Sequence, residues 1–151
     1  MIETAVILAA GEGSRLRTSA PYKPLCPVAG RPLIDHALEG LAAAGLTRAI
    51  VVLGYGEEAI AAHLASRRWP LAVETVRSDP RRPNGVSVLA AAPLLAGGEA
   101  VLAMCDHLVT PAHYARLARA KQQYDPDGLF FVRHGVGSEQ WSDDGFTKVT
   151  A

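Results

Sequence analysis

Residues 6–15 read Val-Ile-Leu-Ala-Ala-Gly-Glu-Gly-Ser-Arg, a run of small apolar side chains that ends in a loop with two glycines. The apolar run predicts a buried strand. Gly11 and Gly13 carry no Cβ, so the backbone N–H groups of this loop can turn towards an anion. Arg15 and Lys23 place positive charge beside the loop. The stretch predicts a strand followed by a cradle for a triphosphate; an ordinary glycine-rich turn is the alternative.

The loop differs from the two best-known phosphate-binding patterns. A dinucleotide fingerprint requires a third glycine and an immediate helix, but Leu16 stands at the third glycine's position. Pro21, Pro24, Pro27 and Pro32 follow, and they prevent a helix from starting close behind the glycines. The Walker pattern is also missing from the sequence. We therefore expect a long, basic, proline-stiffened loop that wraps around its ligand.

The rest of the chain alternates apolar runs with helical patterns. Strands are expected at 4–9, 49–53, 71–76, 100–104 and 129–132, and helices at 33–44, 57–66, 87–95 and 112–122. This alternation predicts a three-layer α/β/α sandwich with a mostly parallel sheet. Ligands in such sheets bind at the carboxyl ends of the strands. Residues 10–31, 54–56, 77–86 and 105–110 are therefore expected to share one rim.

Length and composition limit the class of protein. The chain has 151 residues, which fits one domain over 1–151, and 15 basic residues balance 15 acidic ones. This balance argues against nucleic acid as a partner. No apolar stretch approaches the roughly 20 residues of a membrane helix, so we expect no membrane segment and a cytoplasmic location. Cys26 and Cys105 are expected to be small buried groups, and His36, His63 and His113 to lie at the surface.

Several motifs resemble those of a known superfamily. Residues 8–16, 23–25 and 28–34 resemble the N-terminal signature of the sugar-phosphate nucleotidyltransferases. Asn84-Gly85-Val86-Ser87-Val88-Leu89 and Met104-Cys105-Asp106-His107 narrow the likeness to cytidylyltransferases that act on inositol 1-phosphate. A shorter chain that is also similar is the N-terminal cytidylyltransferase domain of the bifunctional cytidylyltransferase/phosphoenolpyruvate mutase of fosfomycin biosynthesis. The resemblance implies a nucleotide-diphospho-sugar transferase-like fold, C-terminally shortened. The chain stops at residues 146–151 within a further predicted strand, so we expect a domain excised from a longer bifunctional chain, or an unusually minimal enzyme.

The resemblance also implies roles for individual residues. Arg15 and Lys23 are the expected catalytic residues, Asp106 the ligand of Mg²⁺, and His107 and Arg133 the acceptor-binding residues. Nucleotide binding is expected from two segments of the chain: Leu8, Ala9, Ala10, Gly11, Glu12, Gly13 and Ser14, and then Asn84, Gly85 and Ser87.

Several of these roles have a structural alternative. Asp106 could be a helix N-cap or a loop acid, and Asn84 an N-cap followed by Ser87 in the first turn. His107 could be a rim histidine without a ligand. Asp143 or Asp144 could supply a second carboxylate to the metal, or both could be solvated residues of a turn before Gly145.

The implied reaction is attack by an oxygen of a small phosphate or phosphonate acceptor on the α-phosphorus of CTP, with release of pyrophosphate. The acceptor would be of the 2-hydroxyethylphosphonate or inositol-1-phosphate type. Because the nucleophile is already ionised, the reaction needs positioning and charge neutralisation rather than a general base. Two alternatives stay open: a sugar-1-phosphate nucleotidyltransferase that uses another nucleotide, and a catalytically inactive nucleotide-binding regulatory domain.

Overall fold

The computed structural model describes residues 2–13, 20–108, 110 and 112. The chain divides into two compact units, Met1–Arg116 and Leu117–Ala151, and the described residues all belong to the first. Several predicted features lie outside the described residues. These are the strand at 129–132, nearly all of the helix at 112–122, and the residues Ser14, Arg15, His113, Arg133, Asp143 and Asp144.

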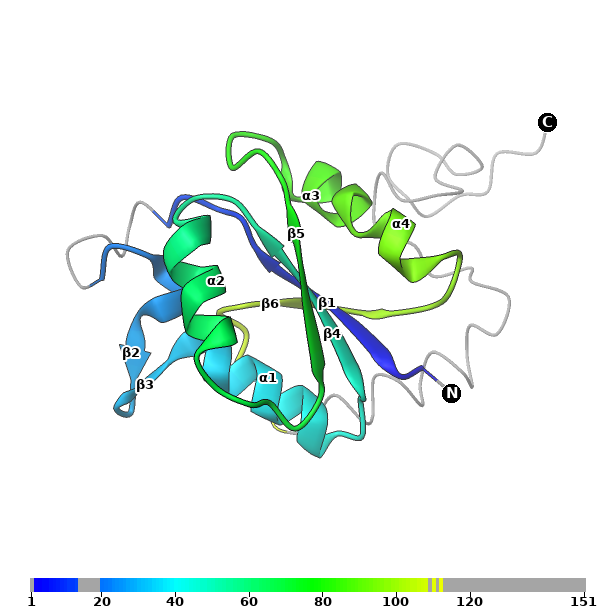
Figure 1. Cartoon of the computed structure of the whole chain (residues 1–151), viewed down its shortest axis with the longest axis horizontal. Coiled ribbons are helices and arrows are strands. Elements are labelled where there is room, and N and C mark those ends of the chain that lie inside the picture. The colour runs from blue at the N-terminus through cyan, green and yellow to red at the C-terminus, as the bar shows by residue number, and fades with distance from the viewer. Residues whose placement is uncertain (1, 14–19, 109, 111, 113–151) are drawn as a thin grey trace, which may run out of the picture. The chain divides into compact units, whose positions relative to one another are not determined.

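Four parallel strands form the central sheet (Figure 1): β1 (Thr4–Ala9), β4 (Arg48–Leu53), β5 (Ala72–Arg77) and β6 (Val101–Met104). Their order is β5-β4-β1-β6. β1 and β4 are buried over their last five residues, as expected of strands covered on both faces. Each strand lies within one residue of its predicted position, and the predicted parallel α/β sheet is confirmed.

The side chains of β1 and β4 alternate between two apolar clusters, one on each face of the sheet. On one face, Ile7 and Val51 pack with residues of α1 (Leu33–Ala43) and α2 (Glu57–Ala65). On the other face, Leu8 and Val52 pack with residues of α3 (Asn84–Ala90) and α4 (Ala92–Leu95). Helices therefore cover both faces, which confirms the three-layer arrangement.

The end of α1 follows from one glycine. The N–H of Gly45 donates to the carbonyl of Ala42 at 2.9 Å, and the N–H of Leu46 donates to the carbonyl of Leu41 at 3.2 Å. These two bonds form a Schellman motif, which requires a left-handed residue after the helix. Gly45 has a φ of +95° and supplies it. The predicted helix end at Gly45 is confirmed.

The prediction of one helix over 87–95 is wrong in two respects. α3 begins earlier, at Asn84, because Pro83 occupies the N-cap position in an extended conformation (φ −58°, ψ 153°). The helix then breaks at Ala91, and α4 starts afresh with Pro93 in its first turn. Proline has no N–H to donate within a continuous helix, so the chain cannot run straight through residue 93.

The proline-rich segment after the glycine loop contains only short elements within its described part. A 3₁₀ turn, η2, covers Lys23–Leu25, and a small antiparallel hairpin follows, built from β2 (Pro27–Val28) and β3 (Arg31–Pro32). Both residues at the hairpin tip have positive φ, at 48° for Ala29 and 77° for Gly30. Among the described residues, no helix is long and apolar enough to cross a membrane.

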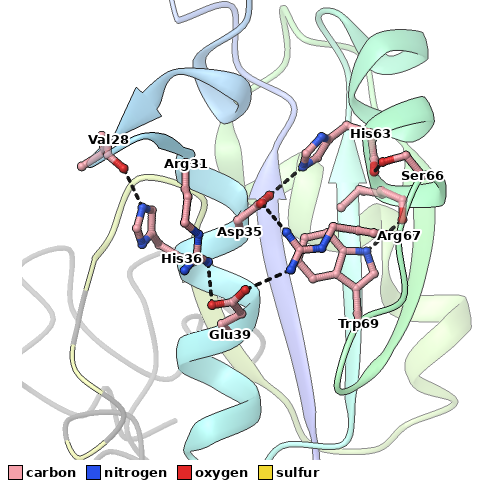
Figure 2. Close-up of polar contacts among 10 residues, drawn as sticks. Val28, Arg31, Asp35, His36, Glu39, His63, Ser66, Arg67 and Trp69 are labelled. Atoms are coloured by element: carbon pink, nitrogen blue, oxygen red, sulfur yellow. Dashed lines mark hydrogen bonds and ion pairs between the residues drawn. The ribbon is translucent and has the colours of Figure 1, made fainter.

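A buried carboxylate connects α1 to α2 (Figure 2). Asp35, on α1, is 2% exposed, and its two oxygens bind His63 Nε2 at 2.6 Å and Arg67 Nη1 at 3.0 Å. The Arg67 guanidinium also lies 4.5 Å from the centre of the Trp69 ring. The expectation that His63 is a surface residue is wrong, because the pairing with Asp35 holds its ring half-buried between the helices.

Two further contacts attach the β2–β3 hairpin to α1 (Figure 2). Arg31 Nη2 lies 2.5 Å from Glu39 Oε2, and His36 Nε2 lies 2.8 Å from the carbonyl oxygen of Val28. The hydrogen bond from Arg31 lowers the pKa of Glu39 below its ordinary value, against the opposing effect of burial. The hairpin therefore has a defined position on the helix.

Candidate functional site

A cavity of about 240 Å³ lies at the carboxyl ends of β1 and β6. It is lined by the end of β1 with the glycine loop, by η2, by the start of α3 and by the end of β6. The lining residues are Leu8, Ala9, Ala10, Gly11, Gly13, Lys23, Pro24, Asn84, Ser87, Met104 and Cys105. This is the rim at which ligands bind in parallel sheets of this kind.

Most of the described residues that the sequence assigns to nucleotide binding line this cavity. They are Leu8, Ala9, Ala10, Gly11, Gly13, Asn84 and Ser87, joined by the expected catalytic residue Lys23. Glu12 and Gly85 lie in the same segments but do not line the cavity. Ser14 and Arg15 lie outside the described residues. The glycine loop and the Asn84 segment, distant in sequence, therefore belong to one site.

Gly13 permits the close approach of the catalytic candidate. Its φ is +57°, and a Cβ built on it would lie 2.6 Å from the Cβ of Lys23. A side chain at this position would push Lys23 away, so the glycine is required by the packing as well as by the backbone. Gly11 differs, because nothing lies within 4 Å of its Cβ position and the loop there stays open.

Lys23 forms an ion pair with Asp106 across the site. Lys23 Nζ lies 2.6 Å from Asp106 Oδ2, and the two side chains are 25% and 32% exposed. Asp106 is the second residue after β6, and the N–H of the residue between them, Cys105, donates to the carbonyl of Leu8 at 3.2 Å. Partial burial disfavours the charged form of Asp106, but the hydrogen bond and the positive charge of Lys23, with smaller backbone and His107 contributions, together outweigh it. The pKa of Asp106 therefore lies below its ordinary value.

The other oxygen of Asp106 has the properties of a metal ligand. Oδ1 is buried and has no hydrogen-bond partner among the described residues. A carboxylate oxygen is the ligand that Mg²⁺ prefers, and Mg²⁺ is often held by one or two carboxylates together with substrate phosphates. Within the described part of the chain, no cluster of three acidic, histidine or cysteine side chains is present. Asp106 therefore fits a magnesium ion that takes its remaining ligands from phosphate and water.

The start of α3 supplies polar groups to the cavity. Pro83 is the N-cap residue and Asn84 is the first helical residue, so the alternative in which Asn84 is the N-cap is wrong. Ser87, one turn later, is 3% exposed, and the hydroxyl of Ser78 donates to its oxygen at 3.2 Å. Ser78 follows β5 directly, so this hydroxyl pair joins the two ends of the connection between β5 and α3.

Three lining residues were not assigned to the site from the sequence: Pro24, Met104 and Cys105. Their position in the sequence could have indicated them, because Pro24 follows Lys23, and Met104-Cys105 precedes Asp106 at the end of a strand. Both cysteines are buried, as expected. Burial raises the pKa of Cys105 to about 11, so its thiol is uncharged at neutral pH. His107 follows Asp106 in the chain, and its N–H donates to the Met104 carbonyl at 3.1 Å.

Curated proteins similar to this chain are bifunctional. A "Bifunctional IPC transferase and DIPP synthase" from Rubrobacter xylanophilus is 40% identical over 121 residues, which are 80% of this chain and 27% of that protein. A "Bifunctional protein GlmU" from Listeria welshimeri is 33% identical over 121 residues, 80% of this chain and 25% of that protein. The chain thus spans about a quarter of the length of these relatives.

Solved structures show the same fold. A nucleotidyl transferase from Methanothermobacter thermautotroptrophicus is 30% identical with a TM-score of 0.64, over 77% of this chain and 56% of that chain. An apo UDP-glucose pyrophosphorylase has a TM-score of 0.66 at 21% identity, over 82% of this chain and 56% of that chain, and supports the fold alone.

The expected relationship to nucleotidyltransferases is confirmed by the family match. Residues 5–140 match the MobA-like NTP transferase domain, so the match includes both the glycine loop and the Asp106 segment. The chain belongs to the family of MobA-like NTP transferase domains.

Proposed function

We propose that this domain transfers the nucleotidyl group of a nucleoside triphosphate to a small phosphate-bearing acceptor and releases pyrophosphate. The observation that carries the proposal is the ion pair at the cavity, where Lys23 Nζ lies 2.6 Å from Asp106 beside a loop with two glycines. One ammonium and one carboxylate with a buried, unpaired oxygen are the groups needed to hold phosphates and their counter-ion.

In this proposal, Lys23 neutralises the charge that develops on the α-phosphate. An acceptor phosphate or phosphonate oxygen is already ionised at neutral pH, so no side chain has to remove a proton from it. The oxygen forms a bond to the α-phosphorus while the bond to the pyrophosphate leaving group breaks. Catalysis then comes from alignment of two anions and from charge neutralisation. Arg15, which lies outside the described residues, is proposed to bind the triphosphate.

Asp106 is the residue proposed to hold Mg²⁺, through its Oδ1 atom. When bound, the ion would neutralise phosphate oxygens. Lys23 pairs with the other oxygen, Oδ2, so the ion and the ammonium would hold the same carboxylate through different atoms.

We propose CTP as the nucleotide and a small phosphate or phosphonate as the acceptor. Two observations support this choice: the likeness of residues 84–89 and 104–107 to cytidylyltransferases, and the 40% identity to a protein named as an IPC transferase. Asn84 lines the cavity and carries an amide that can pair with both donor and acceptor edges of a base. His107, and Arg133 outside the described residues, are the proposed acceptor contacts.

The test is pyrophosphate release with Mg²⁺, each of CTP, UTP, GTP and dTTP, and a panel of phosphate and phosphonate acceptors. Turnover with CTP above the other nucleotides is expected. Turnover with another nucleotide and a sugar phosphate would replace CTP by that nucleotide. Binding of CTP without turnover for any acceptor would refute the catalytic proposal in favour of a nucleotide-binding module.

Two variants test the residue roles. Lys23→Ala and Asp106→Asn are each expected to lower turnover by about 10²–10³-fold, the usual cost of removing a group that stabilises transition-state charge. Glu39→Gln is the matched control, because it removes a carboxylate that binds Arg31 and Arg67 and does not line the cavity. Unchanged rates in the first two variants, with melting temperatures retained, would remove both residues from the site.

A further inference from the structure

The ring of Tyr22 lies directly against the backbone of Gly56. A Cβ built on Gly56 would lie 2.1 Å from Cδ1, 2.6 Å from Cε1 and 2.8 Å from Cγ of Tyr22. No side chain fits there, so the glycine forms the surface on which the ring packs. Gly56 also has a φ of +74° and is the N-cap residue of α2.

The loop that carries Gly56 is itself attached to the end of β1. The N–H of Tyr55 donates to the carbonyl oxygen of Ala10 at 3.0 Å. A Cβ on Gly54 would lie 2.6 Å from the same oxygen, so this loop and the start of the glycine loop are in close contact. The Tyr55 ring adds a tilted contact with Tyr22, with ring centroids 5.9 Å apart. Tyr22 therefore packs on a support that belongs to the site's own strand.

Tyr22 is the residue that begins the turn carrying Lys23. It is the N-cap of η2, and its carbonyl accepts the N–H of Leu25 at 3.0 Å. Gly13 admits the Cβ of Lys23. The side chain of Lys23 therefore packs on Gly13, its chain neighbour Tyr22 packs on Gly56, and its Nζ pairs with Asp106.

We propose that Tyr22, packed on Gly56, is a positioning residue for Lys23: the ring fixes the start of the Lys23 turn and thereby the direction of the ammonium. The proposal rests on the catalytic role of Lys23 given above. Displacement of a catalytic group by about 1 Å can cost about 100-fold in rate, so loss of the ring contact should lower kcat. The KM for the nucleotide should change little, because Lys23 acts on charge that develops in the transition state.

The experiment is a double-mutant comparison of Gly56→Ala, Tyr22→Ala and the double variant. Gly56→Ala is expected to lower kcat by about 10–100-fold, because the new methyl group displaces the ring. In the Tyr22→Ala background, Gly56→Ala should lower kcat by less than about twofold, since the ring that the methyl group would displace is absent. Gly30→Ala is the matched control: its φ of +77° is nearly that of Gly56, but nothing lies within 4 Å of its Cβ position.

A second measurement does not depend on turnover. Acylation of Lys23 by an amine reagent, followed by peptide mass spectrometry, reports how firmly Nζ is held at Asp106. Partly exposed ion pairs are worth up to about fivefold in population, so Gly56→Ala should speed acylation by about twofold to fivefold. If the wild type turns over no acceptor, the proposed function fails, and the acylation rates still test the positioning.

Three results would overturn the positioning role. One is an equal cost of Gly56→Ala with and without the Tyr22 ring, which would indicate backbone strain alone. Another is an equal loss of kcat in Gly30→Ala. The third concerns Tyr22→Phe, which keeps the three ring carbons in contact with Gly56 and should recover the activity and slow acylation that Tyr22→Ala loses. Failure of this recovery would refute the role of the ring, even where Gly56→Ala does not fold.

Discussion

Replacement of Asp35 tests the buried contact between α1 and α2. The Asp35 side chain is 3% exposed and binds two partners, His63 and Arg67. Asp35→Ala removes the carboxylate, so both donors lose the acceptor of their hydrogen bonds. Asp35→Asn keeps the shape but removes the charge, and its amide group must face one of the two donors. Both variants should therefore lower the free energy of unfolding.

The size of the loss follows from the exposure of the partners. A hydrogen bond to a charged group contributes about 1.5–3 kcal/mol. Arg67 is 42% exposed and keeps Glu39 at 3.2 Å, so it recovers most of its loss from water. His63 is only 23% exposed and recovers less. We expect Asp35→Ala to cost about 2–3 kcal/mol and Asp35→Asn about 1–2 kcal/mol, less than for a fully buried pair. At 151 residues, these losses lower Tm by about 2–12 °C.

Urea unfolding and thermal melting measure the effect. The control is Glu39→Gln, one helical turn away, whose 36% exposed carboxylate should contribute less than about 1 kcal/mol. A double-mutant cycle of Asp35→Asn with His63→Ala isolates their coupling, which should exceed about 0.5 kcal/mol. If Asp35→Asn proves as stable as the wild type, or costs no more than Glu39→Gln, the role of this carboxylate as a stabilising contact is refuted.

Three further outcomes are expected around the site. Gly13→Ala should lower both Tm and turnover, because its Cβ would meet Lys23, whereas Gly11→Ala should change Tm by less than Gly13→Ala does. Lys23 lowers the pKa of Asp106 in the folded protein. The stability gained from the ionised carboxylate is therefore present above its ordinary pKa and lost as the pH falls through the folded-state pKa. In urea unfolding, the difference in the free energy of unfolding between wild type and Asp106→Asn should shrink as the pH falls through that range. With its pKa at about 11, Cys105 should react with iodoacetamide at about pH 8 at least about 100-fold more slowly in the folded protein than in urea.

The sheet was predictable because burial on both faces leaves a strong signal. β1 and β4 are continuous apolar runs, and their predicted limits agree with the structure to within one residue. The first turn of α3 carried no such signal. Val86 is 40% exposed, so the turn shows no apolar face, and Pro83 sets the start of the helix through its backbone alone. Predictions from periodicity therefore failed where a proline decided the boundary.

The contact of Asp35 with His63 was not predictable from pattern. An acidic residue in the first turn of a helix is ordinarily explained by the helix dipole and by exposure to water. A histidine in another helix gives no sign that it faces that acid. The available signal was that Ile34, Ala37 and Leu38 flank Asp35 on the buried side of α1. A carboxylate among such neighbours needs a donor, but the sequence does not say which element supplies it.

The roles of the rim loops depend on the order of the strands, which the sequence pattern left open. Leu8 pairs with Met104 on one side of β1 and with Val52 on the other. Because β6 is the neighbour on the first side, Asp106, two residues after the end of β6, reaches Lys23, which lines the cavity. Because β4 is the neighbour on the second side, its loop packs against Ala10 and Tyr22 rather than lining the cavity. The loops predicted to share one rim therefore have two different roles. The loop after β6 contributes to the site, whereas the loop after β4 supports it, and the side of β1 on which each strand lies decides between these roles.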